Sequence, residues 1–317
     1  MIFGILNPYL QEMDIVRNYL YWTNNPKDVK SFATSCIKFN NAVLAIEQDA
    51  VYWIIKLQLH YNVNIQEKVE SSILQQLYSL IFGHEGNLQA VFTHCFENNK
   101  ADYIHILLQD KRVDPTTENN LAIRSTSRKG YLSIVKELLQ DKRANPNAEF
   151  DYPIRFAAQY GHDQVVAELL TDKRVDPLAQ NSEAIRFAAQ NGHLDVVIKL
   201  LQDGRANPAA LNNHAIRYAS SRGYSAIVER LLQDKRVNPA DTSNEAIRLA
   251  SSYGYLEVVE ILLQDERVDP TIRNNEAIHL AFINYRSFIV KRLLRDERIF
   301  ITLPTVRLAL YKKHCQL

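Results

Sequence analysis

Two adjacent histidine–cysteine pairs are the residues best suited to thiol or metal chemistry in this chain. His94-Cys95 and His314-Cys315 lie far apart in the sequence, whereas a metal site or an activated thiol needs such groups to converge. The sequence holds no glycine-rich phosphate loop and none of the patterns His-Glu-x-x-His, Cys-x-x-Cys or Gly-x-Ser-x-Gly. We therefore expect no catalytic, cofactor-binding or metal site, and a protein that is not an enzyme.

Five arginines recur at one constant spacing: Arg124, Arg155, Arg186, Arg217 and Arg248. Guanidinium groups bind phosphates and carboxylates well, so this ladder suits an anion or an acidic partner. Residues that recur identically, however, usually build the stack itself. Three glutamates also lie within reach of neighbouring arginines: Glu183, Glu245 and Glu276. We expect a framework role for the ladder, with anion binding as the alternative.

Short Asp-Lys-Arg blocks form a second recurring basic feature. They lie at residues 110–112, 141–143, 172–174 and 234–236. Each block carries its own acid and lies near the C-terminus of an expected helix, where cations offset the helix dipole. The prediction for these blocks is solvated helix ends, not a binding surface.

Prolines and glycines share the period of the arginines. The prolines are Pro115, Pro146, Pro177, Pro208, Pro239 and Pro270, and the glycines are Gly130, Gly161, Gly192, Gly223 and Gly254. Both residue types mark turns and helix ends. A fixed period between about 20 and 50 residues indicates a solenoid of copied units, which offers a binding surface before it offers a pocket.

Residues 244–273 show what one copy contains. Apolar residues at helical spacing from Ala246 predict a short helix, which Gly254 ends in a left-handed conformation. A second helix with a broad apolar stripe follows, and Asp269-Pro270 forces an extended connector. The first copy, at 88–118, has Asn99 at the turn position and the last has Tyr285. Such departures are typical of copies that cap an array.

The unit resembles an ankyrin repeat. Glu-Ala-Ile-Arg-x-Ala stands where that family has Thr-Pro-Leu-His-x-Ala, and residues 192–197, Gly-His-Leu-Asp-Val-Val, match its second-helix entry. The resemblance covers residues 88 to about 300 and implies an all-α solenoid of about seven helix-turn-helix copies, with a closing helix around 305–311. The unit repeats every 31 residues, whereas the ankyrin unit repeats every 33. This difference implies that the hairpin finger between copies is shortened. Variants of this kind resemble the ankyrin arrays of giant amoebal viruses and amoebae.

The ankyrin resemblance also implies where a target protein binds. In that pattern the two residues before each turn glycine face a concave groove. Here these residues are Arg128, Lys129, Gln159, Tyr160, Gln190, Asn191, Ser221, Arg222, Ser252 and Tyr253. The residues before each first helix, such as Asp151-Tyr152 and Asn212-Asn213, are expected at finger tips. The alternative is an ordinary polar face.

Residues 1–60 lack the repeat. Residues 25–36 (NPKDVKSFATSC), followed by Phe39 and by Asp49 to Trp53, resemble the second half of an F-box. This resemblance implies docking on a Skp-type adaptor, and thereby on a cullin ubiquitin ligase. The docking residues would be Ile15, Leu20, Val29, Phe32, Ala33 and Phe39. The alternative is a helical cap on the first copy, in a scaffold or decoy protein without a ubiquitin link.

These patterns give three predicted parts: an F-box-like module at 1–60, a connecting helix within 61–87, and the array with its closing helix at 88–317. The 37 basic and 36 acidic residues nearly cancel, which gives no global attraction to nucleic acid. Three scattered cysteines favour a reducing compartment. The N-terminus lacks the features of a secretory signal, and no apolar run approaches the length of about 20 residues that spans a bilayer. We expect a cytoplasmic protein with protein partners, in the host cytoplasm if it is viral.

Overall fold

The computed structural model describes residues 50–63, 65, 69–302, 307, 309–311 and 313. The chain divides into two compact units, Met1–Leu88 and Gln89–Leu317. The six predicted adaptor-docking residues, from Ile15 to Phe39, lie outside the described residues. The F-box-like module and the predicted domain bounds therefore stay predictions.

The described part of the first unit is a helical hairpin. Helix α4 (Ala50–Tyr61) packs on α5 (Ser71–Gly83), and Trp53 of α4 is buried in the core between them. The side chains of Leu74, Leu77 and Ile81 line α5 at helical spacing and are fully buried. A helix expected within residues 61–87 is thus confirmed, and a turn with two positive-φ residues, Glu85 and Gly86, follows it.

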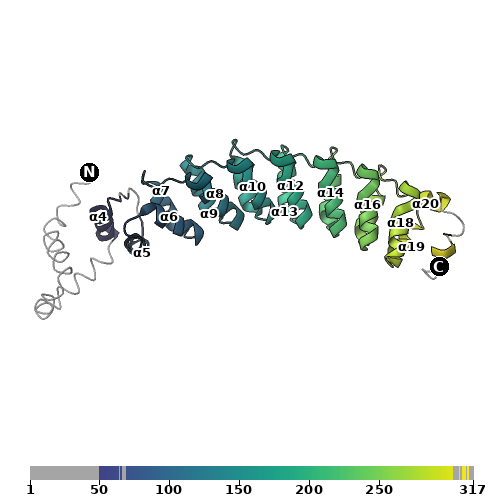
Figure 1. The fold of residues 1–317 in the computed structure, drawn as a ribbon, viewed down its shortest axis with the longest axis horizontal. Helices are drawn as coiled ribbons and strands as arrows, with labels where there is room; N and C mark the ends of the chain where they lie inside the picture. Colours follow the sequence, from purple (N-terminus) through teal and green to yellow (C-terminus); the bar gives the residue numbers. More distant parts are fainter. Residues whose placement is uncertain are drawn as a thin grey trace, which may run out of the picture. The chain divides into compact units, whose positions relative to one another are not determined.

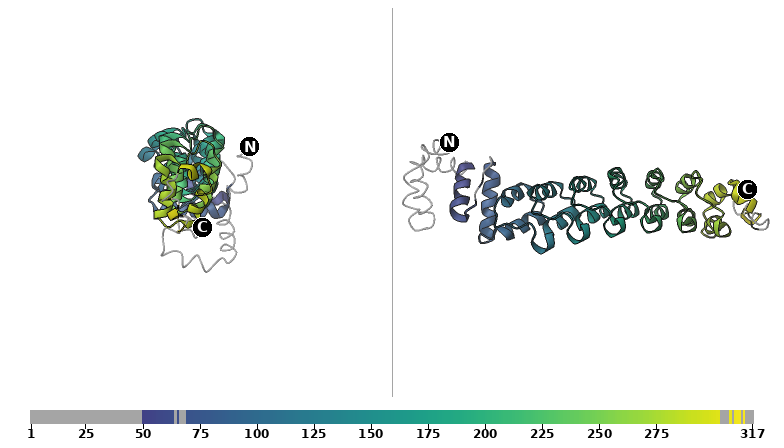
Figure 2. Two further views of the ribbon diagram at one scale, coloured as in Figure 1. Left: turned by 90° about the vertical axis from the view of Figure 1, so that its right-hand side faces the viewer. Right: turned by 90° about the horizontal axis from the view of Figure 1, so that it is seen from above.

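The second unit is an array of seven described helix pairs, which confirms the predicted number of copies. Figure 1 shows the pairs in order along the array, and Figure 2 shows their helices in two rows. The pairs are α6 (Leu88–Glu97) with α7 (Ala101–Leu108), α8 (Thr117–Lys129) with α9 (Leu132–Asp141), α10 (Ala148–Gln159) with α11 (Asp163–Thr171), α12 (Ala179–Asn191) with α13 (Leu194–Asp203), α14 (Ala210–Arg222) with α15 (Ser225–Leu232), α16 (Asp241–Tyr253) with α17 (Leu256–Leu263), and α18 (Ile272–Ile283) with α19 (Ser287–Leu293). The short α20 (Glu297–Thr302) follows them.

Each helix pair buries its apolar stripe against the neighbouring pairs. The isoleucine of each first helix from Ile123 to Ile278 is fully buried, as is one leucine of each second helix from Leu138 to Leu293. First helices pack on first helices and second helices on second helices. Because a single pair leaves these stripes open to water, the stack is what makes each copy stable.

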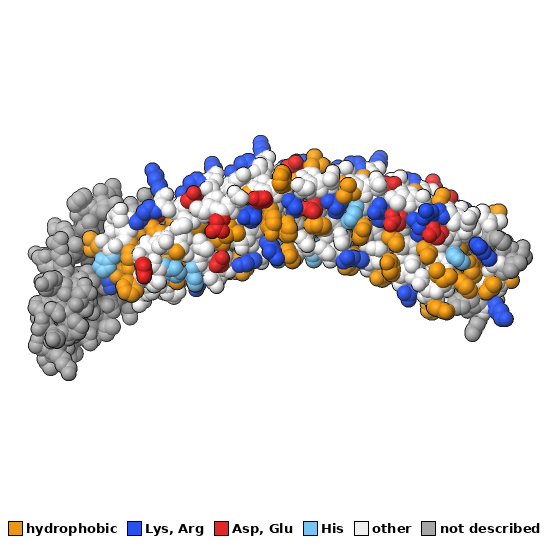
Figure 3. All heavy atoms as spheres, in the orientation of Figure 1, with side chains coloured by type: hydrophobic (Ala, Val, Ile, Leu, Met, Phe, Trp, Pro, Cys, Tyr) orange, Lys and Arg blue, Asp and Glu red, His pale blue; other side chains and the backbone are white. Residues whose placement is uncertain are grey.

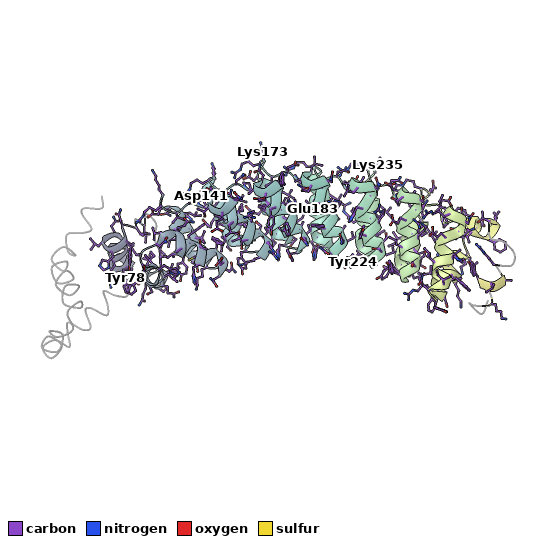
Figure 4. The ribbon with its side chains drawn as sticks, viewed as in Figure 1. Tyr78, Asp141, Lys173, Glu183, Tyr224 and Lys235 are labelled. Atoms are coloured by element: carbon purple, nitrogen blue, oxygen red, sulfur yellow. The ribbon has the colours of Figure 1, made fainter. Side chains whose placement is uncertain are left out.

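The array has two edges of different composition. We call the side with the turns between paired helices (residues 128–131 and their equivalents) the turn edge. The side with the connectors between copies (residues 110–120 and their equivalents) is the loop edge. Tyr224 lies at the turn edge and Lys173 and Lys235 at the loop edge (Figure 4). The array by itself bends so that the turn edge is on its concave side (Figure 1).

A short left-handed turn opens the first helix in six copies. Three consecutive residues at each of these sites have φ between 52° and 63°, for example Leu211, Asn212 and Asn213. The third residue is the structural one: Asn213 is buried and its Oδ1 accepts a hydrogen bond from the backbone N–H of Asn238 at 2.7 Å. The equivalent side chains accept from the N–H of the residue before each connector proline: Asn120, Asp151, Ser182 and Asn244.

This turn corrects one prediction. Asp151 and Asn213 do not lie at exposed finger tips, because both are buried and bridge to the next copy. Desolvation by that burial raises the pKa of the Asp151 carboxyl. Asn212 is exposed, as expected. Within the described residues, the connection that would form a hairpin finger between copies consists of one left-handed turn.

The turn glycines meet two requirements at once. Gly161 has φ +78°, and a Cβ there would lie 2.5 Å from Nδ1 of His193 in the next copy. The ring of His193 is held in place by a contact of 2.9 Å between its Nε2 and the carbonyl oxygen of Gln159. Asn99 and Tyr285 replace the glycine in the end copies and keep positive φ, at 55° and 60°. The turn geometry therefore persists where the glycine does not.

Aspartate–arginine pairs two residues apart, including those of the Asp-Lys-Arg blocks at 141–143, 172–174 and 234–236, hold neighbouring copies together. Arg174 forms an ion pair with Asp172 at 2.7 Å and donates from Nη1 to the carbonyl oxygen of Ala144 in the preceding copy at 3.0 Å. The hydrogen bond from Arg174 holds the pKa of the Asp172 carboxyl below its usual value. The same two contacts are made by Arg143, Arg205, Arg236, Arg267 and Arg298. The lysines and arginines of the four blocks are exposed, as predicted for solvated helix ends, and the prediction missed only that arginines such as Arg174 also bond to the preceding copy.

Two further predictions concern the ends of the chain. No described helix combines the length and hydropathy needed to cross a membrane. The closing helix expected around 305–311 lies partly outside the described residues. Arg307, residues 309–311 and Lys313 are helical, and Tyr311 is buried with its hydroxyl 3.0 Å from Nδ1 of His279.

Candidate functional site

The arginine ladder runs along one face of the first helices. Each arginine closes the left-handed turn of its own copy: Arg186 donates from Nε to the carbonyl oxygen of Asn181 and from Nη2 to that of Gln180, both at 2.9 Å. The other four arginines make equivalent bonds to one or both carbonyls. Because these hydrogen bonds tie each arginine side chain to the backbone of the turn, the arginines stabilise the turn. The predicted framework role is confirmed.

The next copy supplies each arginine with a partner at the start of its own first helix. We call each ladder arginine together with the residue at this partner position a rung. In three rungs the partner is a glutamate: Glu183 pairs with Arg155, Glu245 with Arg217 at 3.2 Å, and Glu276 with Arg248 at 2.9 Å. Glu183 lies in the middle of the face shown in Figure 4, and acidic and basic side chains lie side by side along that face in Figure 3. These pairings confirm that the glutamates reach neighbouring arginines.

Two rungs of the ladder have no acidic partner at this position. Tyr152 takes the partner position of Arg124, with the guanidinium 5.5 Å from the centre of its ring. His214 takes the partner position of Arg186. Burial, and then the charges of Arg186 and Arg217, lower the pKa of His214 to about 4. His214 is therefore neutral at physiological pH, and in neither rung does the partner position carry a compensating negative charge.

All ten predicted groove residues are exposed or half-buried. Arg128, Lys129, Tyr160 and Tyr253 are among the exposed ones. Some groove residues also join copies: Asn191 donates from Nδ2 to the carbonyl oxygen of Gln159 at 3.1 Å. The residues thus lie where a partner has access to them, while their part in binding stays a prediction.

An open pocket of about 430 Å³ lies on this surface between α8 and α10. Its lining combines three groove residues with four others: Leu121, Arg124, Ser125, Arg128, Lys129, Tyr152 and Tyr160. Nη2 of Arg128 donates to the Tyr160 hydroxyl at 3.3 Å, and the ring of Tyr152 stacks on Phe156 with centres 3.8 Å apart. Three cations and two tyrosines therefore face one open space. Among the residues that the structure describes, no acidic one lines it.

Sequence reasoning missed part of this pocket. Leu121, Arg124, Ser125 and Arg128 follow one face of α8 at helical spacing, a signal that was present in the sequence. Tyr152 was expected at a finger tip, yet it is half-buried and forms a wall of the pocket. Its occurrence where other copies have glutamate was the available clue.

The opposite end of the turn edge carries several exposed apolar side chains. Exposed side chains there are Tyr253, Ile283, Tyr285 and Phe288, the last with 76% of its surface accessible. Tyr285 and Phe288 were not among the predicted groove residues. Their signal was the departure of the last copy from the repeat pattern, which was interpreted as capping alone.

A family model described as ankyrin repeats matches the chain three times, at residues 125–212, 154–242 and 216–304. These matches together span 125–304, more than half of the 317 residues. The chain belongs to the ankyrin-repeat family. Ankyrin repeats bind protein partners, so the array has a protein-interaction role, and its all-helical fold is typical of non-enzymatic interaction scaffolds. No match was found among curated protein sequences.

Of the residues considered for metal or thiol chemistry, the structure describes His94 and Cys95. No group of three or more His, Cys, Asp or Glu side chains within the described residues is arranged to hold a metal ion. Cys95 is buried, which raises the pKa of its thiol to about 12 and keeps it protonated. His314 and Cys315 lie outside the described residues.

Proposed function

We propose that this ankyrin-repeat protein is a non-catalytic interaction protein that holds a target protein along the turn edge and the adjoining face of its first helices. One observation carries this proposal. The recurring ladder arginines and the third residues of the left-handed turns are engaged in stacking, whereas the accessible residues before the turn glycines change from copy to copy. Invariant contacts build the stack, so the changing positions are the ones free to specify a partner.

The side chains offered on this surface suit a protein interface. Tyr160, Arg222 and Tyr253 are accessible, and tyrosine and arginine dominate the binding energy of many protein interfaces. The concave side of the array also lets one extended segment contact several copies. This surface supports recognition of a folded or extended protein target.

For the N-terminal part we propose an F-box-like module that docks on a Skp-type adaptor, which would make the chain a substrate-recruiting subunit of a cullin-type ubiquitin ligase. The support is the sequence resemblance of residues 25–53, and the docking residues Ile15, Leu20, Val29, Phe32, Ala33 and Phe39 come from it. The sparse cysteines and the resemblance to giant-virus and amoebal arrays support a cytoplasmic site of action. The competing function is a scaffold or decoy protein in which residues 1–60 act as a cap.

Adaptor binding is tested with the full chain and a purified Skp-type adaptor in titration calorimetry. We expect binding that is weakened at least about tenfold by Phe32→Ala with Phe39→Ala, since buried aromatic anchors dominate such interfaces. The control is Tyr253→Ala, which leaves the module unchanged. Absence of adaptor binding by the wild-type chain would favour the scaffold function.

Target binding is tested with proteins recovered by proximity labelling around the full chain in cells and then purified. We expect Tyr160→Ala, Arg222→Ala and Tyr253→Ala each to weaken direct binding by about tenfold, the effect of one interface anchor. Lys173 of the loop edge provides the control, as Lys173→Ala. Equal affinity of all three variants for every recovered target would place the interface elsewhere on the chain.

A further inference from the structure

At the pocket between α8 and α10, a ladder arginine that is accessible to solvent lacks the glutamate that pairs with the arginine in other rungs. In three other rungs a glutamate from the next copy neutralises the arginine. Here Tyr152 stands in that position and leaves the charge of Arg124 without an acidic partner there. The other rung without an acid, Arg186 with His214, has a buried arginine and so offers little access. The pocket therefore combines uncompensated charge with accessibility.

The three cations of the pocket retain hydrogen-bonding capacity. Arg124 donates to the carbonyl oxygens of Asn119 and Glu118 through Nε and Nη2, which leaves Nη1 without a hydrogen bond to the described residues. Arg128 uses Nη2 for the Tyr160 hydroxyl, and Lys129 donates one hydrogen bond, to the carbonyl oxygen of Glu97 at 3.1 Å. Each group is thus held in place while other N–H donors remain. Pre-positioned donors of this kind bind an anion at low entropic cost.

The walls of the pocket indicate the kind of molecule that carries the anion. Tyr152 and Tyr160 flank the cations, and Leu121 adds an apolar surface. Such walls suit the aliphatic or aromatic stem of an amino-acid side chain. The chain as a whole has 37 basic and 36 acidic residues, so its net charge gives no global attraction to a nucleic acid. The pocket also includes Arg128, Lys129 and Tyr160, and is therefore continuous with the proposed target-binding edge.

We infer that this pocket binds an acidic side chain, a carboxylate or a phosphate, carried by an extended segment of the protein target. This inference rests on the proposed function and adds the chemistry of the recognised residue. Arg128 and Lys129 supply the charge that selects the acidic residue, because Arg124 is also needed to close its own turn. Guanidinium and ammonium groups stabilise either anion through short, charge-assisted hydrogen bonds.

The test uses the immobilised full chain and four degenerate peptide libraries. The central residue of the libraries is Glu, phosphoserine, Gln or Ser, with random residues on both sides. We expect the Glu or phosphoserine library to be retained about tenfold more than its neutral counterpart, the gain from one charge-assisted contact. Comparison of the Glu and phosphoserine libraries identifies the preferred anion. The preference should fall as salt is raised, because the cations are exposed.

The decisive variant is Arg128→Gln with Lys129→Gln, which removes two charges and leaves the ladder arginine in place. It should abolish the acidic preference, whereas Arg222→Gln, which removes an arginine at the position equivalent to Lys129, should keep it. Retention of peptides that depends on Tyr253 but shows no acidic preference would overturn the inference and leave the proposed function standing. An acidic preference that survives in the double variant would also overturn it. No retention of any library would count against both.

Discussion

The loop edge and the turn edge of the ankyrin array are built from the same repeating unit, yet their polar residues differ in what they contact. At the loop edge, equivalent residues make equivalent contacts in copy after copy, as in the clamps of Arg174, Arg205 and Arg236. At the turn edge the exposed residues change, from cations around α8 to apolar side chains around α18 and α19. The recurring arginines of the loop edge are engaged with a neighbouring copy, whereas the varying residues of the turn edge are accessible.

The turn edge is nevertheless not free of framework residues. The glycines and the rings that pack over them from the next copy, such as His162 and His193, hold one turn against the next. Framework residues and the proposed recognition residues thus alternate within a few positions of the chain. Single substitutions can therefore separate stability from binding along one edge.

The largest expected loss of stability comes from a substitution at the turn edge. Gly161→Ala should lower the free energy of unfolding by about 3 kcal/mol, because a left-handed residue with a Cβ is strained and the new methyl group overlaps the His193 ring. Gly204→Ala is the matched control, since Gly204 has nearly the same φ, +80°, and no atom lies within 4 Å of the place its methyl carbon would take. It should cost about 1 kcal/mol. Urea denaturation measures both free energies of unfolding. Equal losses in the two variants would show that the close approach of the His193 ring to Gly161 contributes nothing to the cost.

A smaller effect is expected from removal of a loop-edge contact between copies. Asn213→Ala leaves the N–H of Asn238 and one oxygen of Asp241 without their bonds, and should cost about 2 kcal/mol. Asn212→Ala changes the exposed neighbour in the same left-handed turn and should cost about 0.5 kcal/mol. Urea denaturation of both variants checks this. Similar losses would contradict the assignment of the third turn residue as the bridging one.

Placing an acidic residue opposite Arg186, as in three other rungs, should stabilise the array. His214→Glu places the carboxylate that three other rungs have beside Arg186 and should add about 1 kcal/mol, with allowance for solvent screening. In the wild type the pKa of His214 is lower in the folded state, about 4, than in the unfolded state. The unfolded state then binds the proton first, so the contribution of His214 is complete above the unfolded pKa of about 6.5 and is lost as pH falls towards 4.

The pH dependence separates this site from the loop-edge carboxyls. The depressed pKa values of aspartates such as Asp172 and Asp234 cost stability only as pH falls to their ordinary value near 4 and below it. Unfolding measured between about pH 7 and 5 should therefore show a smaller slope in His214→Gln than in the wild type. An unchanged slope would mean that His214 titrates normally in the folded protein.

The smallest expected effect on stability is that of an exposed turn-edge residue. Tyr253→Ala should change the free energy of unfolding by less than about 0.5 kcal/mol, because its side chain is largely exposed. Tyr255→Ala, two positions along the chain, should cost about 1 kcal/mol since its ring packs over Gly223. A loss for Tyr253→Ala as large as that for Tyr255→Ala would assign Tyr253 to the framework.

Much of this architecture could be predicted from residue spacing. The period located the helix pairs, the turn glycines and the framework arginines, because each copy repeats its contacts with identical residues. The left-handed turn was missed, because residues as different as Glu118, Gln180 and Leu211 begin it and no single residue type marks it. The clamps were missed because their acceptors are backbone carbonyls of the preceding copy, which sequence does not distinguish.

The sequence by itself determined the helical repeat, its number of copies and the positions that vary, since these depend on local periodicity and on residues that recur. Only the tertiary structure decided which varying positions act together. Arg128 and Tyr160 belong to different copies, and they share a pocket because adjacent copies stack in register. A binding site in a solenoid combines side chains from neighbouring copies, so its charge and depth depend on the stacking and not on any one copy.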